Sequence, residues 1–311
     1  MQQFYLFKQV PKARYGGHEG LLPKKHWLKR AVTSAVRDPH FWCQPQPGLW
    51  GLTPTMLKAV KHWAIAFKLL EPQGQNQYYK VSDFARALLF DDGADPYLED
   101  PQSQWLLHWQ LLREPCYLKT WQWFFNQFYL TEFEPESALQ QYVEYVHNVG
   151  DTIAESTLAA DLKCLYKLYL DSHEGHLEDQ LTALFTDLTL LCGDATKGSH
   201  KDGLRKRIGL KELSPEALLY ACLEYTQQRH GKTQLIDLKE LLYTPNSPGL
   251  VFWVSQYQLE GVLDKLCSQC SWLHLNACAD LNQLAWDLPT TECLQAVWQS
   301  LYRLEPTEAE G

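Results

Sequence analysis

The chain has 311 residues, 45% hydrophobic and 21% charged, which is typical of globular proteins and excludes a disordered chain. Its opening, MQQFYLFKQVPKARYGG, lacks the apolar core of a signal peptide, and no run reaches the ~18 apolar residues of a membrane span. Nine scattered cysteines argue against a disulfide framework, so we expect a cytoplasmic protein. The net charge is −9, yet the first 90 residues hold 13 Lys and Arg against 4 Asp and Glu. We therefore expect the amino-terminal part to bind a polyanion.

The amino-terminal part predicts a winged helix-turn-helix. Residues 1–22 form an irregular arm, and a helix over Lys24–Val36 ends at Asp38-Pro39. Thr53 and Pro54 are start signals for a second helix that is predicted to run to Leu70. A turn over 74–77 then joins the two strands of a hairpin, and Ser82 caps a third helix. Helix, turn, helix and hairpin is the layout of a winged helix.

The middle of the chain reads as helical. Residues 95–128 are rich in Trp, and two further helices, Pro135–His147 and Ser156–Leu170, form a second possible helix-turn-helix. A basic loop over 192–211 follows. Trp105, Trp109, Trp121 and Trp123 are expected to lie mostly in the core, with one or two exposed to anchor a partner protein.

The last hundred residues predict a small α+β unit that is again winged-helix-like. Its expected elements are helices at Ser214–Arg229, Leu235–Tyr243 and Gln256–Cys267, and strands at Leu250–Val254 and Trp272–Leu275. The fold class is therefore mainly α with small β-hairpins. We expect a basic winged-helix domain over 1–92, a helical, Trp-rich domain over 93–195 and a C-terminal domain over 196–311.

The second predicted helix is amphipathic, and its solvent face carries lysines and neutral polar residues. Lysines on a groove-sized helix neutralise phosphates, while the preceding helix clamps the DNA backbone. The competing interpretation is a solvated lysine face on a structural helix. The predicted DNA-binding residues are Lys24, Lys25, Lys29, Arg30, Thr53, Thr55, Lys58, Lys61, His62 and Lys68.

Three other groups of residues are weaker candidates. The basic loop supplies a possible secondary phosphate contact through Lys201, Arg205, Lys206 and Arg207, unless it is simply a solvated loop. The spacing of Cys267, Cys270, His274 and Cys278 permits a zinc site but favours small buried thiols. Six residues would form an acid–base or metal site if the fold brings their side chains together: His18, Glu19, Asp95, Glu99, Asp100 and His108.

Four sequence blocks resemble a known family. They are Gly17-His18-Glu19 with Trp27-Leu28-Lys29-Arg30, the stretch 50–63, Asp95–Asp100 with His108-Trp109, and 247–252. They are similar to an uncharacterised bacterial family encoded beside DNA phosphorothioation (Dnd-type) sulfur-modification genes and in related defence islands. The family's Gly-Lys-Asn turn is Thr53-Pro54-Thr55 here. The resemblance implies a DNA-modification or phage-defence context and supplies no catalytic mechanism.

The function expected from these patterns is a non-enzymatic DNA-binding or scaffold subunit of such a system. Its partners would be double-stranded DNA and a sulfurtransferase or ATPase component. No cofactor is expected, because no Gly-rich phosphate loop or catalytic signature is present. The alternatives are a transcriptional regulator of the same gene cluster, a protein-interaction module without DNA contact, and a hydrolase whose motif is hidden.

Overall fold

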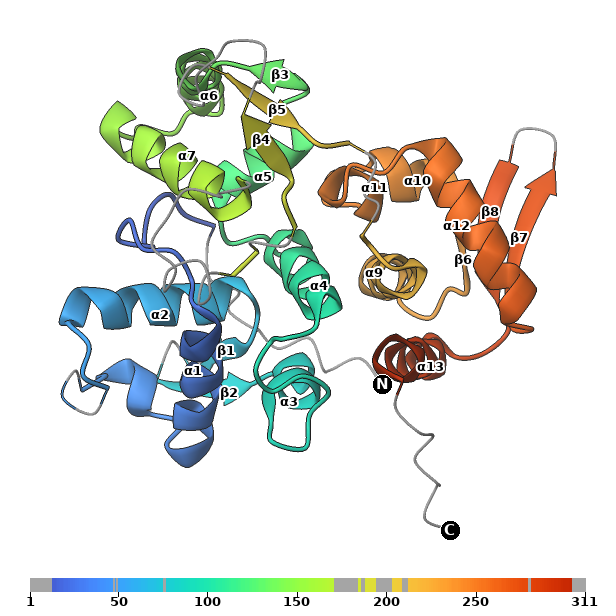
Figure 1. Ribbon diagram of the computed structural model, residues 1–311, viewed down its shortest axis with the longest axis horizontal. Coiled ribbons are helices and arrows are strands. Elements are labelled where there is room, and N and C mark those ends of the chain that lie inside the picture. The colour runs from blue at the N-terminus through green and yellow to red at the C-terminus, as the bar shows by residue number, and fades with distance from the viewer. Residues whose placement is uncertain are drawn as a thin grey trace. The chain divides into compact units, whose positions relative to one another are not determined.

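The chain forms two compact units, the first ending at Arg207 and the second beginning at Ile208. The structure is a computed structural model (Figure 1). It describes residues 13–46, 48, 50–74, 77–170, 184–185, 188–193, 203–208, 212–278 and 281–303.

The first unit opens with two helices, a hairpin and a third helix, in the predicted order. These are α1 (Lys25–Arg37), a short 3₁₀ helix (Phe41–Cys43), α2 (Pro54–Ala66), β1 (Leu70–Gln73), β2 (Tyr78–Val81) and α3 (Asp83–Leu89). Both predicted caps are present: Thr53 accepts a hydrogen bond from the Met56 N–H, and Ser82 accepts one from the Ala85 N–H. The apolar face of α1 lies in the core, against α2 and the hairpin.

Helix α2 ends at Ala66, four residues before the predicted end at Leu70. The backbone of Lys68 is left-handed, with φ of 56°, and the Leu69 N–H returns to the Ala64 carbonyl. This is a common way for a helix to stop. Leu70 can then begin β1, where it pairs with Val81.

The rest of the first unit is helical around a small sheet. Its elements are α4 (Pro101–Leu112), α5 (Lys119–Asn126), β3 (Glu132–Phe133), α6 (Pro135–Asn148), α7 (Glu155–Tyr169), β4 (Leu191–Gly193) and β5 (Leu204–Lys206). The predicted helices are confirmed. The prediction of a continuous loop over 192–211 was wrong where it covers β4 and β5, which pair antiparallel.

Aromatic side chains fill the core of this unit. Trp63, Trp121, Phe124, Tyr142 and Tyr169 are among its largest buried residues. The prediction that one or two tryptophans of the Trp-rich segment anchor a partner was wrong. The exposed fractions of Trp105, Trp109, Trp121 and Trp123 are 1%, 0%, 1% and 4%.

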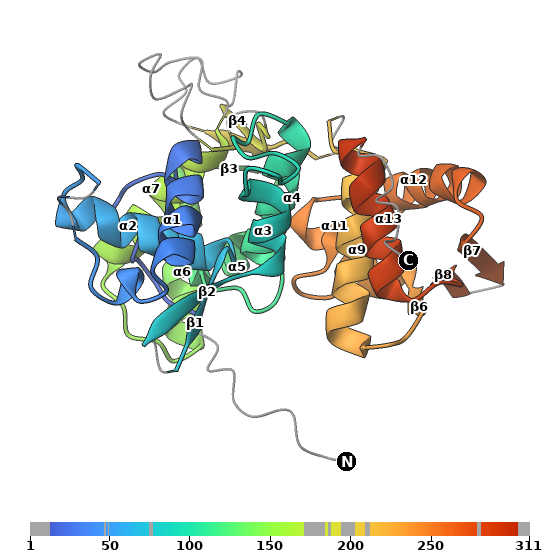
Figure 2. The same cartoon turned by 90° about the horizontal axis from the view of Figure 1, so that it is seen from below.

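The described part of the second unit consists of eight elements, five helices and the three strands of one sheet. They are α9 (Pro215–His230), β6 (Leu235–Asp237), α10 (Leu238–Tyr243), α11 (Pro248–Val251), α12 (Gln256–Gln269), β7 (Leu273–Cys278), β8 (Leu281–Trp286) and α13 (Thr290–Tyr302). Figure 2 views these elements from below.

Three details of the second unit differ from the sequence expectation. The predicted strand Leu250–Val254 is wrong, because Pro248 starts the short helix α11 there. The first residues of the predicted helix at Leu235 form strand β6 instead. Strand β8 and helix α13 were not predicted at all.

All described sheets are small and antiparallel, so the mainly α class is confirmed. The first sheet is the two-stranded hairpin β1-β2. The other two have the strand orders β3-β5-β4 and β6-β8-β7. In the described part of the chain, no helix is both long and apolar enough to cross a bilayer.

Candidate nucleic-acid interface

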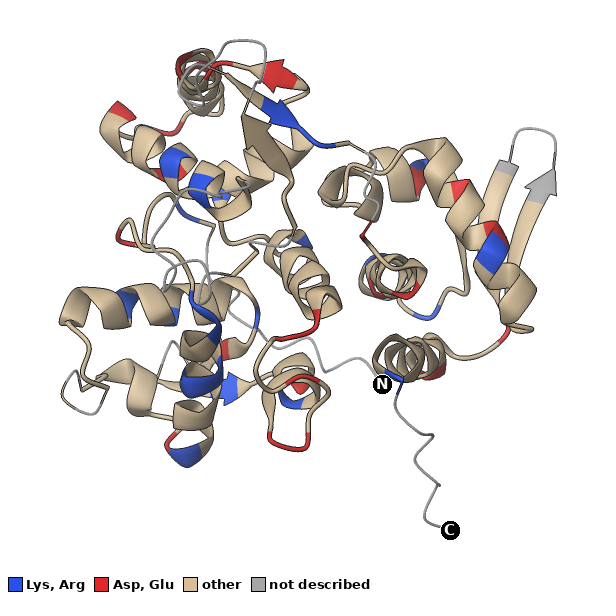
Figure 3. Cartoon of the chain, in the orientation of Figure 1, with Lys and Arg blue, Asp and Glu red and all other residues tan. Residues whose placement is uncertain are grey.

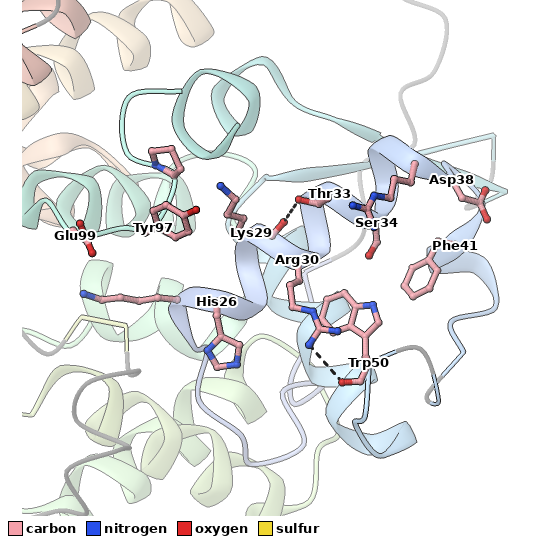
Figure 4. Close-up of a pocket in the computed structure, with 13 residues that line it drawn as sticks. His26, Lys29, Arg30, Thr33, Ser34, Asp38, Phe41, Trp50, Tyr97 and Glu99 are labelled. Atoms are coloured by element: carbon pink, nitrogen blue, oxygen red, sulfur yellow. Dashed lines mark hydrogen bonds between the residues drawn. The ribbon is translucent and has the colours of Figure 1, made fainter. Parts of the chain in front are cut away.

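A groove of 870 Å³ runs along the solvent face of α1 (Figure 4). The opposite face of the helix is buried through Trp27, Leu28, Ala31, Val32 and Ala35, which fixes the orientation of the polar side chains. Residues from the segment after α1 and from the turn before α4 complete the walls. The lining residues are Lys25, His26, Lys29, Arg30, Thr33, Ser34, Arg37, Asp38, Phe41, Trp50, Pro96, Tyr97 and Glu99.

Two of the cations in this groove lie against aromatic rings. The Arg30 guanidinium carbon is 4.3 Å from the centroid of the Trp50 ring, and its Nη1 donates to the Trp50 carbonyl at 3.4 Å. The Lys29 ammonium is 4.4 Å from the centroid of the Tyr97 ring. Such contacts restrict the long side chains before any ligand arrives, which lowers the entropic cost of binding an anion.

Carboxylates also stand near the groove, but they leave an excess of positive charge. Four permanently cationic side chains line it, against the two carboxylates of Asp38 and Glu99. Lys29 pairs with Asp91 at 2.7 Å, and this hydrogen bond lowers the pKa of Asp91. The Asp91 side chain is 93% exposed, so the pair is a weak surface ion pair that a phosphate can replace. Figure 3 shows Lys and Arg along α1 and acidic residues in the loop after α3.

His26 adds a titratable group to the groove. Burial lowers its pKa below the usual 6.5, and the neighbouring charges of Lys24 and Arg30 lower it further. The imidazole is therefore mostly neutral at pH 7 when the groove is empty. A bound phosphate would favour the charged imidazolium, so the complex would take up a proton.

Anion binding in this groove is therefore expected to strengthen as the pH falls from about 7 to 5. The gain should begin as the pH drops toward the pKa that His26 has in the complex. The measurement is the dissociation constant for duplex DNA as a function of pH, at constant ionic strength. In His26→Gln the groove keeps its shape without a titrating ring, and the pH dependence should flatten. An equally steep dependence in that variant would contradict the assignment.

The predicted DNA-binding residues are divided between different environments. Lys25, Lys29 and Arg30 line the groove, and Lys24 stands beside it at the N-cap of α1. Thr55 and Lys58 are exposed on α2, and Thr53 is exposed but serves as the helix cap. The Lys61 ammonium donates to the Trp42 carbonyl at 2.6 Å and lies over the Tyr79 ring. The basic face of α2 is therefore narrower than the helical wheel predicts.

Two of the contacts predicted for the second helix, Lys68 and His62, are corrected by burial. Lys68 is 6% exposed, and its ammonium donates to the Gln110 carbonyl inside the first unit, because α2 ends before it. The ring of His62 packs against Gly17, where an added Cβ would lie 2.6 Å from Nδ1. Burial, the largest cause, lowers the pKa of His62 to about 3, so it is no cation at neutral pH. Neither residue is presented to a phosphate.

The basic segment around Arg205 contains both exposed and buried cations. Arg205 and Arg207 are exposed, and the Arg207 Nη1 donates to the Thr189 hydroxyl at 2.9 Å. Lys206 is 7% exposed, and its ammonium lies over the rings of Phe124 and Phe128. Burial lowers the pKa of Lys206 to about 7. Its prediction as a phosphate contact is corrected, since β5 directs it into the core. Lys201 lies outside the described residues.

His18 belongs to a buried hydrogen-bond network that fixes the amino-terminal arm. The Gly20 N–H donates to His18 Nδ1 at 3.0 Å, so the ring proton lies on Nε2, which donates to Asp161 Oδ1 at 2.8 Å. Asp161 also accepts from the Gly16 N–H at 3.0 Å and from the Thr120 hydroxyl at 2.7 Å. This carboxylate therefore joins the arm to α5 and α7.

The six residues considered for an acid–base site do not gather. Glu19 is exposed, and Asp95 is buried in a turn where it accepts from the Glu99 and Asp100 N–H groups. Asp100 itself caps α4. The His108 ring is in the core, with Nδ1 2.9 Å from the Tyr169 hydroxyl. These contacts indicate structural roles.

Among the described side chains, the residues with zinc-like spacing do not form a cluster either. Cys267 lies in the last turn of α12 and Cys270 is its C-cap, whereas His274 on β7 lies 2.7 Å from Asp287. Cys278 is at the far end of β7. Within the described ranges, no three His, Cys, Asp or Glu residues are placed to hold a metal ion.

Sequence reasoning missed Arg37, Trp50 and Tyr97 in the groove, and Asp161 in the network. Trp50 and Tyr97 lie inside the blocks that carry the family resemblance, so that signal was available. Asp161 interrupts the apolar face of α7 between Leu158 and Leu162, which is the mark of a buried charge that requires partners.

Comparison with known proteins identifies the family. The profile of the family described as "Protein of unknown function (DUF4007)" matches residues 15–302. The chain belongs to this family. A search of curated proteins returned no match.

Two solved structures share the fold. The structure described as magnesium ion-bound SspB superposes with a TM-score of 0.85, at 24% identity over 97% of this chain and 92% of that chain. A second SspB crystal structure gives a TM-score of 0.84 with the same identity and coverage. At this identity the similarity establishes the fold of the DUF4007 chain.

Proposed function

We propose that this protein is a DNA-binding and scaffold subunit of a DNA phosphorothioate-modification or phage-defence system. The groove along α1 holds the phosphate backbone of duplex DNA. The α1–α2 pair and the β1-β2 hairpin act as a winged helix-turn-helix, with Lys58 and Thr55 on the exposed face of α2. The protein brings modification enzymes to DNA by holding both, which raises their local concentration.

One observation carries this proposal: four cations of α1 line a single groove in the most basic part of an acidic chain. The excess of positive charge suits a polyanion, and the aromatic contacts of Arg30 and Lys29 hold two of the cations in place. The biological context rests on the sequence blocks that resemble the family encoded with sulfur-modification genes. The shared fold with SspB is compatible with that context.

The test is binding of the full chain to a labelled duplex of random sequence, measured at several salt concentrations. A backbone-binding protein should show a linear fall of log affinity with log salt, with a slope of about −0.9 for each phosphate contacted. Random and promoter sequences should bind equally, because lysine contacts to phosphates carry little sequence information. No measurable binding at low salt would overturn the proposal, and strong preference for one promoter would favour a regulator.

A second candidate function is magnesium-dependent action on the bound DNA, and the magnesium ion in the SspB structure favours it. Within the described residues, no three His, Cys, Asp or Glu side chains cluster. No chemical step follows from them. The readout is conversion of supercoiled plasmid to open circles in the presence of Mg²⁺, compared with EDTA.

A further inference from the structure

Two segments of the chain contain three-stranded sheets of the same topology. Among the described elements of the first unit, α5, β3, α6, α7, β4 and β5 occur in this order, and the sheet has the order β3-β5-β4. In the second unit, α9, β6, three helices α10 to α12, β7 and β8 follow one another, and the sheet has the order β6-β8-β7. In both sheets the last strand is central and antiparallel to its two neighbours.

This order is that of a winged helix, in which a strand pair follows a helix-turn-helix. The helix before the strand pair is the one that enters the DNA groove in such proteins. Among the described helices, α7 is the last before the strand pair of the first unit, and α12 is the last before that of the second. The surfaces of these two helices therefore decide whether either segment can meet a polyanion.

The exposed stripe of α7 is positively charged. Ser156, Ala160, Lys163 and Lys167 follow one another at intervals of three or four residues, and all are exposed, so they share one face of the helix. The opposite face is buried through Leu158, Leu162, Leu165 and Leu168. One acidic residue, Glu155, lies in the first turn of the helix. Within the described residues, neither lysine forms an ion pair with a carboxylate.

The orientation of this stripe is fixed from inside the protein. Asp161 lies on the buried side of α7 and is 2% exposed. It is hydrogen-bonded to His18, Thr120 and the Gly16 backbone, so α7 cannot rotate about its axis without breaking a buried charge network. The lysines are thus presented on a rigid helix and not on a loop.

The corresponding face of α12 has a different character. Its exposed residues include Tyr257, Gly261, Asp264, Lys265 and Ser268, with Tyr257 87% exposed. Asp264 offsets the charge of Lys265, and Glu260 accepts from Gln256 and Asn282 on the same side. This helix carries no net positive charge for a phosphate backbone. The two segments share a sheet topology but not a ligand chemistry.

We propose that α7 is a second contact for the DNA backbone, separate from the α1 groove, in which Lys163 and Lys167 neutralise phosphates and Ser156 lies near the duplex. This inference rests on the proposed function, because it assigns a second surface to the same duplex. Charge complementarity and the place of α7 before the strand pair carry it. We expect the two contacts together to occupy a longer stretch of duplex than the α1 groove alone.

The experiment compares the full chain with Lys163→Gln/Lys167→Gln in salt titrations on a duplex of about 20 base pairs, two helical turns. Two lost phosphate contacts should make the salt slope shallower by about 1.8. Between 50 and 200 mM salt, the unmodified chain should then lose about 12-fold more affinity than the variant. The matched control is Lys239→Gln/Lys265→Gln in the second unit, which removes equal charge from exposed positions and should leave the slope unchanged.

Duplex length gives a second readout. The unmodified chain should bind a duplex of about 20 base pairs more tightly than one of about 10, one helical turn, and the α7 variant should lose most of that gain. An unchanged slope and an unchanged gain in the α7 variant would overturn the inference. If Lys25→Gln/Lys29→Gln weakens binding in the same assay, the proposed function stands without it. If the unmodified chain does not bind DNA, both fail.

Discussion

Neutralising Lys25, Lys29 and Arg37 to Gln is expected to weaken duplex binding and to make its salt dependence shallower. Each side chain lines the α1 groove, and none is in the core. If each meets one phosphate, the slope of log affinity against log salt should fall in magnitude by about 2.7. Between 50 and 200 mM salt, the unmodified chain should then lose about 40-fold more affinity than the triple variant. Fluorescence anisotropy with a labelled duplex measures both quantities.

The control for this prediction removes the same charge elsewhere. Lys232, Lys239 and Lys265 are exposed in the second unit, and their triple Gln variant should retain the slope of the unmodified chain. Equal losses in the two variants would mean that net charge alone governs binding, and the α1 groove would lose its assignment. Thermal unfolding of both variants should match the unmodified chain, since all six side chains lie outside the core.

Replacing Asp161 by Ala is expected to destabilise the first unit by about 3–5 kcal/mol, the usual cost of removing one partner from a buried charged network. The change leaves the Gly16 N–H, the His18 Nε2–H and the Thr120 hydroxyl without their acceptor. For a unit of this size, the loss corresponds to a fall of about 10 °C in melting temperature. Urea unfolding followed by tryptophan fluorescence measures the free energy directly.

Asp92→Ala is the matched control, because Asp92 is exposed on the same unit, and its replacement should change stability by less than about 0.5 kcal/mol. Asp161→Asn keeps the size of the side chain and one acceptor oxygen, so its loss should fall between the other two. A stable Asp161→Ala protein would show that the arm is held by its aromatic contacts alone. In that case His18 would owe its position to Trp63 and Trp121, whose ring centroids each lie 6.2 Å from its own.

Local signals were sufficient to predict most helices. Thr53 with Pro54, Ser82 and Ser214 each mark a helix start, and the structure uses each of these residues as an N-cap. The hairpin β1-β2 was predicted because turn residues separate two short apolar runs. These features depend only on neighbours in the sequence, which explains their success.

Tertiary contacts decided what local signals could not. The charged segment around Arg205 reads as a loop, but Leu204 and Lys206 both face inward because β5 is the central strand of its sheet. Lys68 looks like part of a solvent face until the left-handed turn after α2 carries it into the core. The groove brings Trp50 and Tyr97 beside α1. No sequence pattern predicts that these two residues lie next to that helix in the folded chain.

The docking of the arm limits how the two proposed DNA contacts could move relative to each other. Tyr15 donates to Asp151 at 2.6 Å and Gly16 to Asp161, so residues 15 and 16 are held by the α6–α7 connection and by α7 itself. On the same arm, Gly17 packs against His62 of α2, and Trp63 Nε1 donates to the Leu21 carbonyl at 2.9 Å. The arm thus contacts α2 and α7, which carry residues of the two segments that we propose as DNA contacts. Bending of the duplex, and not stretching of a linker, would have to accommodate any mismatch between their spacing and the pitch of the double helix.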